Sequence, residues 1–195
     1  MDDIKSTFSK SFIFGDKGKR RFMDPEKILN EVGLKIGKTV ADLGCGTGFF
    51  VIPAAKILGP EGKIYAIDIQ KLDLAEVEAN ARIFGFKNIE YLQGDLEKEG
   101  STKIPDASLD FVIVSNVLSQ TENDETVLLE AAKFLKPEGK FLLIDWEDTN
   151  TPFGPPREKR LSKDDALSLA SSLGFSLEKE TDAGMYHYGL VFSKN

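Results

Sequence analysis

Short apolar runs alternate with longer mixed segments along the chain, from about residue 39 to residue 146. The apolar runs have the length and the β-branched content of buried strands. We expect these strands at Thr39–Leu43, Lys63–Asp68, Ile89–Gln93, Leu109–Ser115 and Lys140–Trp146. The segments between and after them predict helices at Phe49–Leu58, Leu74–Phe84, Asp124–Leu135 and Lys163–Leu173. Such an alternation predicts a mostly parallel sheet that is covered by helices on both faces.

The last part of the chain departs from this alternation. Two strand-like segments, Phe175–Thr181 and Tyr186–Phe192, are separated by only a few residues. This gap is too short for a crossover helix, so we expect the two strands to pair antiparallel as a hairpin. The predicted fold is therefore an α/β doubly wound, mostly parallel seven-stranded sheet with a C-terminal antiparallel hairpin.

A short helix should precede the sheet. Asp24-Pro25-Glu26 supplies an N-cap, a proline at the first helical position and an acidic first turn, and Gly33 supplies a stop. We expect this helix at residues 25–32 and a single domain at residues 24–195. Residues 1–23 form an N-terminal segment, which we expect to be flexible or to cover the cofactor site.

The strongest chemical signal is an apolar run that leads into an acidic residue and three glycines at alternate positions, Val40-Ala41-Asp42-Leu43-Gly44-Cys45-Gly46-Thr47-Gly48. Glycines let backbone approach a ligand closely, and the N-terminus of the predicted helix that follows suits a carboxylate or phosphate. Nicotinamide enzymes use G-x-G-x-x-G, whereas the spacing here is G-x-G-x-G with Asp42 two residues before the first glycine. This register favours S-adenosylmethionine over NAD.

Further motifs follow the glycine loop at the spacing of a cofactor-binding α/β sheet. The second predicted strand ends in an acidic residue, Asp68, about twenty residues beyond the last glycine. Gln93-Gly94-Asp95-Leu96 follows the third strand, and the fourth reads Leu109-Asp110-Phe111-Val112-Ile113-Val114-Ser115-Asn116. A turn that contains Pro137 and Gly139 leads into the fifth strand.

With these motifs, residues 24–194 closely resemble the class I S-adenosylmethionine-dependent methyltransferases, in particular the small single-domain type 11 (UbiE-like) kind. The resemblance implies a Rossmann-like fold, S-adenosyl-L-methionine as cofactor and S-adenosyl-L-homocysteine as product. It implies that Asp68 holds the ribose hydroxyls, that Asp95 accepts from the adenine amino group, and that the backbone of Leu96 meets the adenine ring. The residues implied to bind the cofactor are Asp42, Gly44, Cys45, Gly46, Thr47, Gly48, Asp68, Ile69, Gln70, Asp95, Leu96, Ser115 and Asn116.

Composition narrows the acceptor class. The net charge of −7 argues against a large nucleic-acid footprint, and one cysteine with one histidine leaves no set of metal ligands, so we expect no metal. We expect a small-molecule acceptor in preference to nucleic acid or protein. The first ten residues lack the apolar core of a secretory signal, and no apolar run reaches spanning length, so we expect a cytoplasmic protein without membrane association.

The residues that act on the acceptor are less evident, because an activated methyl donor needs mainly alignment. His187 and Asp145 are the catalytic candidates. His187 is the side chain that titrates nearest neutrality, and Asp145 lies near the end of the fifth strand. The loop Thr149–Pro156 could cover a pocket, and Arg157 and Arg160 after it fit either an anionic acceptor or a solvated surface.

Two alternative functions remain at this point. A noncatalytic S-adenosylmethionine-binding or interaction protein would keep the same fold and loop, and the sequence displays no obvious base after the fourth strand, where it reads Val117-Leu118-Ser119-Gln120. An NAD-dependent oxidoreductase would need the other glycine register and a continued series of crossovers.

Overall fold

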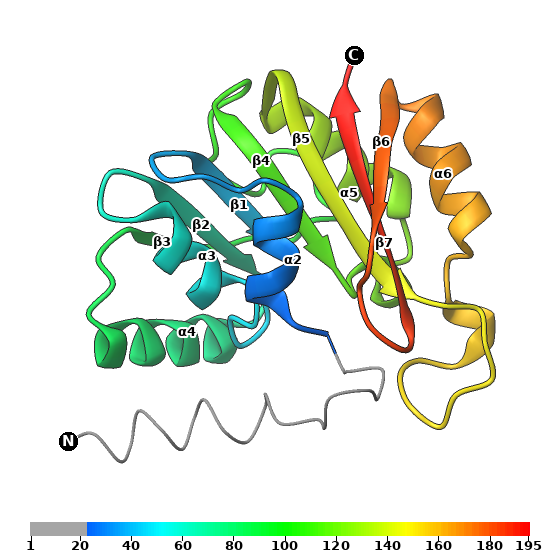
Figure 1. Ribbon diagram of the computed structural model, residues 1–195, viewed down its shortest axis with the longest axis horizontal. Coiled ribbons are helices and arrows are strands. Elements are labelled where there is room, and N and C mark those ends of the chain that lie inside the picture. Colours follow the sequence, from blue (N-terminus) through cyan, green and yellow to red (C-terminus); the bar gives the residue numbers. More distant parts are fainter. Residues whose placement is uncertain (1–22) are drawn as a thin grey trace.

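A seven-stranded sheet runs through the middle of the protein, with helices on both faces (Figure 1). The computed structural model describes residues 23–195, so the expectation for the N-terminal segment lies outside the described residues. The helices are α2 (Pro25–Glu31), α3 (Val51–Leu58), α4 (Lys71–Phe84), α5 (Asp124–Phe134) and α6 (Lys163–Ser172), with short 3₁₀ turns η1 (Leu118–Gln120) and η2 (Arg157–Lys159). The strands are β1 (Thr39–Leu43), β2 (Lys63–Asp68), β3 (Ile89–Gln93), β4 (Leu109–Ser115), β5 (Leu135–Trp146), β6 (Phe175–Thr181) and β7 (His187–Lys194).

The strand order is β3-β2-β1-β4-β5-β7-β6. Strands β1 to β5 pair in parallel, whereas β7 pairs antiparallel with both β5 and β6. The predicted doubly wound sheet with a C-terminal antiparallel hairpin is therefore confirmed. In the described part of the chain, no helix has both the length and the apolar character needed to cross a membrane.

Several element boundaries differ from the sequence prediction, most of them by one or two residues. Helix α3 begins at Val51 and not at Phe49, because Gly48 has a φ of 92° and the chain needs a further turn to reach helical geometry. Helix α4 begins at Lys71, three residues earlier than expected, directly after an extended Gln70. Strand β5 begins at Leu135, which pairs with Leu109 before the register shifts.

Two hydrophobic cores lie on the two faces of the sheet, because strand side chains alternate between faces. One core gathers α2, α3 and part of α4 against residues such as Val40, Ile113 and Ile144. The other gathers α5 and α6 against Val114, Leu143 and the alternate residues of β7. We call these the α3 face and the α5 face of the sheet.

Asp110 ties together three segments at the amino-terminal edge of the sheet. Its carboxylate accepts a hydrogen bond from the backbone N–H of Thr39 at 2.9 Å and pairs with Lys38 at 3.2 Å and Lys136 at 3.1 Å. Burial raises the pKa of Asp110, but the Thr39 N–H and the two lysines outweigh it, so the pKa lies below its ordinary value. Asp110 is thus a structural residue at the edge opposite the glycine loop.

We expect Asp110→Asn to destabilise the protein by about 1–3 kcal/mol at pH 7, since the amide loses the charge that both lysines face. A carboxyl with a lowered pKa in the folded state contributes stability above its ordinary pKa of 3.8, and that stability is lost as the pH falls through the folded-state value. Denaturant unfolding at several pH values should show the deficit of the variant shrinking in acid. A constant deficit across this range would contradict the assignment.

Candidate active site

The carboxylate of Asp68 joins the glycine loop to the start of α4. Its Oδ2 accepts a hydrogen bond from the N–H of Gly46, and its Oδ1 accepts one from the N–H of Gln70, both at 2.9 Å. The carbonyl of Ile67 accepts from the N–H groups of Gly44 and Cys45 at 2.9 and 2.8 Å. The end of β2 therefore fixes the loop that follows β1, and each Asp68 oxygen keeps a second lone pair for a further donor.

The loop conformation depends on its glycines. Gly44, Gly46 and Gly48 have φ values of 73°, 50° and 92°, which L side chains rarely adopt. At Gly44 there is also a steric requirement, because a Cβ there would lie 2.5 Å from Cγ2 of Val117. A Cβ at Gly46 would meet no described atom within 4 Å, so this part of the loop borders open space.

Asp42 and Asp68 place two carboxyl groups under this loop. Asp42 is 2% exposed and Asp68 is 8% exposed. Burial, and then the nearby charge of Asp68, raises the pKa of Asp42 to about 8. Burial and the same two carboxylates raise the pKa of the Cys45 thiol, which makes it a packed and unreactive group. A cation bound here would favour the ionised form of Asp42.

The segment after β3 carries Asp95 and Leu96. The Asp95 carboxylate accepts from the N–H of Glu97 at 3.1 Å and pairs with Lys98 at 2.9 Å, and the Lys98 side chain is 75% exposed. Such an exposed pair is weak and can yield to another donor. Leu96 is buried in the core of the α5 face, whereas Ile69, after β2, is 57% exposed.

The carboxyl end of β4 leads into a strained turn. Asn116 has a φ of 57°, its N–H donates to the carbonyl of Ile144, and its carbonyl accepts from the Gln120 side chain at 2.6 Å. Its side-chain Oδ1 is buried without a hydrogen-bond partner among the described residues. Ser115 and Asn116 thus place polar groups next to the contact between Gly44 and Val117.

The two catalytic candidates lie on opposite faces of the sheet. In the register of β5 and β7, Asp145 pairs with Tyr188 and Trp146 pairs with His187. Tyr188 packs in the core of the α5 face, so Asp145 points to that face and His187 to the α3 face. The strand neighbours of Asp42, Asp68 and Ser115 pack in the core of the α5 face, so these three side chains point to the α3 face as well. His187 therefore shares a face with the glycine-loop carboxylates, and Asp145 does not.

Asp145 is a fully buried carboxyl. Its Oδ1 accepts from the N–H of Trp146 at 2.7 Å, and its Oδ2 lacks a partner among the described residues. Burial raises its pKa to about 6, although the hydrogen bond from the N–H of Trp146 moderates the rise. Asp145 has no exposed surface, so an acceptor cannot touch it directly in this structure.

The loop between β5 and α6 is organised around Arg160. This residue donates five hydrogen bonds, of 2.9–3.0 Å, to the carbonyls of Glu147, Thr149, Phe153 and Pro155. Arg157 forms a two-point pair with Asp148 at 2.6 and 3.1 Å. Both arginines are thus engaged within the loop, and this favours a structural role for Arg160 over capture of an anionic acceptor. One sequence feature points to this packed loop, namely Gly154, eight residues after the only tryptophan. A Cβ at Gly154 would lie 2.7 Å from the Trp146 ring, so the loop backbone packs closely against that ring.

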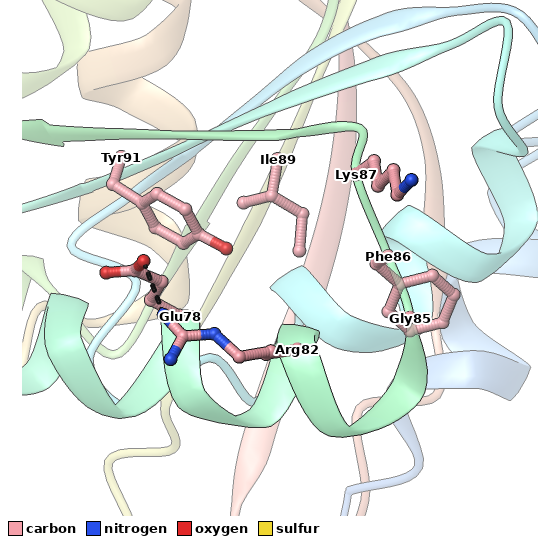
Figure 2. A pocket seen from close by; sticks show the side chains of 7 residues that line it. All are labelled: Glu78, Arg82, Gly85, Phe86, Lys87, Ile89 and Tyr91. Carbon is pink, nitrogen blue, oxygen red and sulfur yellow. Dashed lines mark hydrogen bonds and ion pairs between the residues drawn. The ribbon is translucent and has the colours of Figure 1, made fainter.

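A hollow of about 310 Å³ lies elsewhere, between the second half of α4 and β3 (Figure 2). Figure 2 shows the Glu78–Arg82 pair on α4 facing Tyr91 across it, with Phe86 and Ile89 along the wall. The connection from α4 enters β3 here, so the hollow is on the amino-terminal side of the sheet. Cofactor loops follow the carboxyl ends of parallel strands, and the hollow is therefore separate from the glycine loop.

Comparison with known proteins decides the family. A model described as a methyltransferase domain matches residues 34–181, which include the glycine loop, Asp68, Asp95 and the β4 turn. The chain belongs to this family. The observed sheet, with its antiparallel β7, makes it a class I S-adenosylmethionine-dependent methyltransferase, and S-adenosylmethionine is the cofactor of that family.

Individual relatives agree with this placement. A crystal structure of a SAM-dependent methyltransferase from Aquifex aeolicus is 30% identical, has a TM-score of 0.81, and matches 89% of this chain and 91% of its own. A demethylmenaquinone methyltransferase of Lactococcus lactis is 31% identical over 65% of this chain and 49% of its own length. An arsenite methyltransferase of Aquipseudomonas alcaligenes is 31% identical over 56% of this chain and 33% of its own. The chain thus spans a third to a half of the length of these two curated relatives.

In this methyltransferase we expect Gly44→Ala to weaken binding of S-adenosylhomocysteine and to lower the unfolding temperature, because the new methyl group meets Val117. For thermal unfolding, Gly46→Ala is the matched control, since it carries the conformational cost of a positive φ, about 1 kcal/mol, without the clash. Val117→Ala should recover part of the loss in a double variant with Gly44→Ala. Calorimetry measures the binding, and equal losses of unfolding temperature in the two single variants would refute a steric role for Val117.

Proposed function

We propose that this protein transfers the methyl group of S-adenosylmethionine by in-line displacement to a small-molecule acceptor. The observation that carries the proposal is the buried Asp68 carboxylate, which fixes the glycine loop and retains lone pairs beside the open space at Gly46. The raised pKa of Asp42 adds to this, because a site that disfavours two carboxylates favours a cationic ligand. The residues present therefore fit the cofactor.

Each group has a part in holding the cofactor. Asp68 would accept hydrogen bonds from ribose hydroxyls, Asp95 would accept from the adenine amino group, and the loop from Asp42 to Gly48 would hold the methionine part. When bound, S-adenosylmethionine supplies a methyl group on a positively charged sulfur. The acceptor's lone pair forms the new bond to carbon as the carbon–sulfur bond breaks, and sulfur keeps that electron pair. The protein mainly aligns the acceptor with the methyl group and the sulfur, and such alignment can lower the activation barrier by roughly 7–11 kcal/mol.

The acceptor class rests on composition and relatives. Net negative charge disfavours a polyanionic acceptor. The named relatives act on arsenite and on demethylmenaquinone, both small molecules, although each is longer than the matched region. With one cysteine, this chain has few thiols with which to capture arsenite.

His187 and Asp145 remain the candidates for acting on the acceptor. His187 lies on the face that carries the cofactor carboxylates, and we assign it direct contact with the acceptor. Asp145 is buried on the opposite face, so its part would be indirect.

Turnover separates an enzyme from a noncatalytic binding protein. The purified protein would be incubated with S-adenosylmethionine and a pool of small metabolites, and formation of S-adenosylhomocysteine would be followed by mass spectrometry. Turnover that depends on the pool supports methyl transfer. Tight binding of S-adenosylmethionine without turnover on any fraction of the pool favours the binding protein.

We expect Asp68→Ala to weaken cofactor binding by about ten- to a hundred-fold, because charged hydrogen bonds to ribose contribute roughly 1.5–3 kcal/mol. The variant also frees the N–H groups of Gly46 and Gln70 and so loosens the loop. Asp110→Asn, at the other edge of the sheet, should bind S-adenosylhomocysteine normally. Unchanged affinity of Asp68→Ala in calorimetry would remove Asp68 from the site.

We further expect binding of S-adenosylmethionine to release a proton near pH 7. A pKa of about 8 leaves Asp42 mostly protonated in the free protein, and a nearby cation lowers that pKa and ionises the carboxyl. Calorimetry in phosphate and in Tris, which differ in ionisation enthalpy, should give different apparent binding enthalpies. Asp42→Asn should abolish most of the difference, and identical enthalpies for the unmodified protein would contradict the expectation.

A further inference from the structure

Three side chains lie next to one another at the carboxyl end of β5, with the two aromatic rings tilted by 42° to each other, and we call this cluster the stack. The guanidinium carbon of Arg160 lies 5.5 Å from the centre of the Trp146 ring, and the Trp146 ring lies 4.2 Å from the centre of the His187 ring. The residues come from three elements: the loop after β5, the end of β5 and the start of β7. The indole thus contacts both a cation and an imidazole.

Arg160 has little freedom in this stack. Its five hydrogen bonds use all three nitrogens of the guanidinium and end on four backbone carbonyls. The planar fork of arginine makes such an arrangement, whereas lysine presents a single ammonium. The loop carbonyls therefore fix the cation, and the fixed cation holds the indole.

His187 is buried, with 8% of its surface exposed, and its Nε2 has no hydrogen-bond partner among the described residues. Burial, and then the charge of Arg160, lowers its pKa to about 4. The imidazole is therefore neutral at physiological pH. Further charged residues on the neighbouring ends of β5 and β7 and on their loops include Asp145, Glu147, Asp148, Arg157 and Asp182.

Most of these other charged groups are engaged elsewhere. Asp145 points to the α5 face, Asp148 is paired with Arg157, and Asp182 lies 3.6 Å from Lys27. Arg160 is thus the charged group that acts on His187.

The position of His187 suits contact with an acceptor. The resemblance to the family places the transferable methyl near the end of β4, and β7 lies two strands away, at roughly 10 Å given the usual spacing of strands. Trp146 lies between them on β5, on the same face. A small acceptor bound between the end of β4 and the start of β7 would reach the methyl group on one side and the buried, unpartnered Nε2 of His187 on the other.

We propose that Arg160 is a positioning residue for methyl transfer: through Trp146 it holds His187 as a neutral imidazole whose Nε2 accepts a hydrogen bond from the methyl acceptor. This inference rests on the proposed function and adds a substrate class to it, namely an acceptor that carries a proton on its reacting oxygen or nitrogen. His187 orients that O–H or N–H bond. As the new carbon bond forms, the proton passes to Nε2 or through it to solvent.

The stack can be tested directly because His187 is the only histidine in the chain. After removal of any histidine tag, NMR of the full-length protein labelled with ¹⁵N-histidine gives one imidazole whose pKa and tautomer can be read. We expect a pKa well below the ordinary 6.5 and the proton of the neutral form on Nδ1, which leaves Nε2 bare.

Arg160→Gln should raise the pKa of His187 toward 6.5, since the cation is lost and the ring becomes more hydrated. Arg157→Gln is the matched control: it removes the same charge three residues away, where the side chain is 67% exposed, and should leave the pKa unchanged. Arg160→Lys keeps the charge but not the fork, so it should raise the pKa less. Unchanged S-adenosylhomocysteine affinity shows that each variant is folded.

The same variants carry a second readout. In the metabolite-pool assay we expect Arg160→Gln and His187→Ala to lose turnover by about ten- to a hundred-fold, and Arg157→Gln to keep it. The proposal is overturned if folded Arg160→Gln leaves the pKa of His187 unchanged, if the neutral form carries its proton on Nε2, or if His187→Ala retains full turnover. Absence of turnover in the unmodified protein would instead refute the proposed function, and the NMR result would still judge the stack.

Discussion

The carboxylate of Asp68 is the interaction on which the cofactor side of this protein depends. It joins the end of β2 to the loop after β1 and to the first turn of α4 through two hydrogen bonds of equal length. Burial, and then the nearby charge of Asp68, raises the pKa of the neighbouring Asp42. One side chain thus sets both the shape of the glycine loop and its preference for a cation.

The second organising constraint is the alternation of side chains across a sheet that is buried on both faces. Strand β5 ends with Asp145 on one face and Trp146 on the other, so Asp145 points away from the face that carries His187. His187 joins the cofactor carboxylates on the α3 face. Asp145 joins Tyr188, whose hydroxyl donates to the carbonyl of Leu161 near α6. Asp145 and Trp146, although adjacent in sequence, therefore lie on opposite faces of the sheet.

Much of the fold could be predicted from the sequence, because buried parallel strands are short apolar runs between polar segments. Strands β1 to β4 have the predicted bounds, and the hairpin follows from the short gap before β7. Helix starts were less accurate, since α4 begins without a side-chain cap that a sequence pattern would reveal.

The site was partly predictable for the same kind of reason. Glycine register and acidic strand ends point to Asp42, Asp68 and the cofactor, and the family match confirms the cofactor. The role of Arg160 was not predictable, because it binds backbone carbonyls, which every residue possesses. The sequence also could not show on which face of the sheet Asp145 and His187 lie. Both strands are apolar on both faces, so no alternation of polar and apolar residues marks one face.

The place of β7 in the sheet has a consequence for the order of folding during synthesis. It is the last strand in sequence, yet it lies between β5 and β6 and pairs with both. The residues assigned to the cofactor end at Asn116, so they are synthesised before any part of β5 or β7. His187 reaches Trp146 only after the last strand has been made and inserted between β5 and β6. The residues proposed to hold the methyl donor are therefore synthesised well before His187.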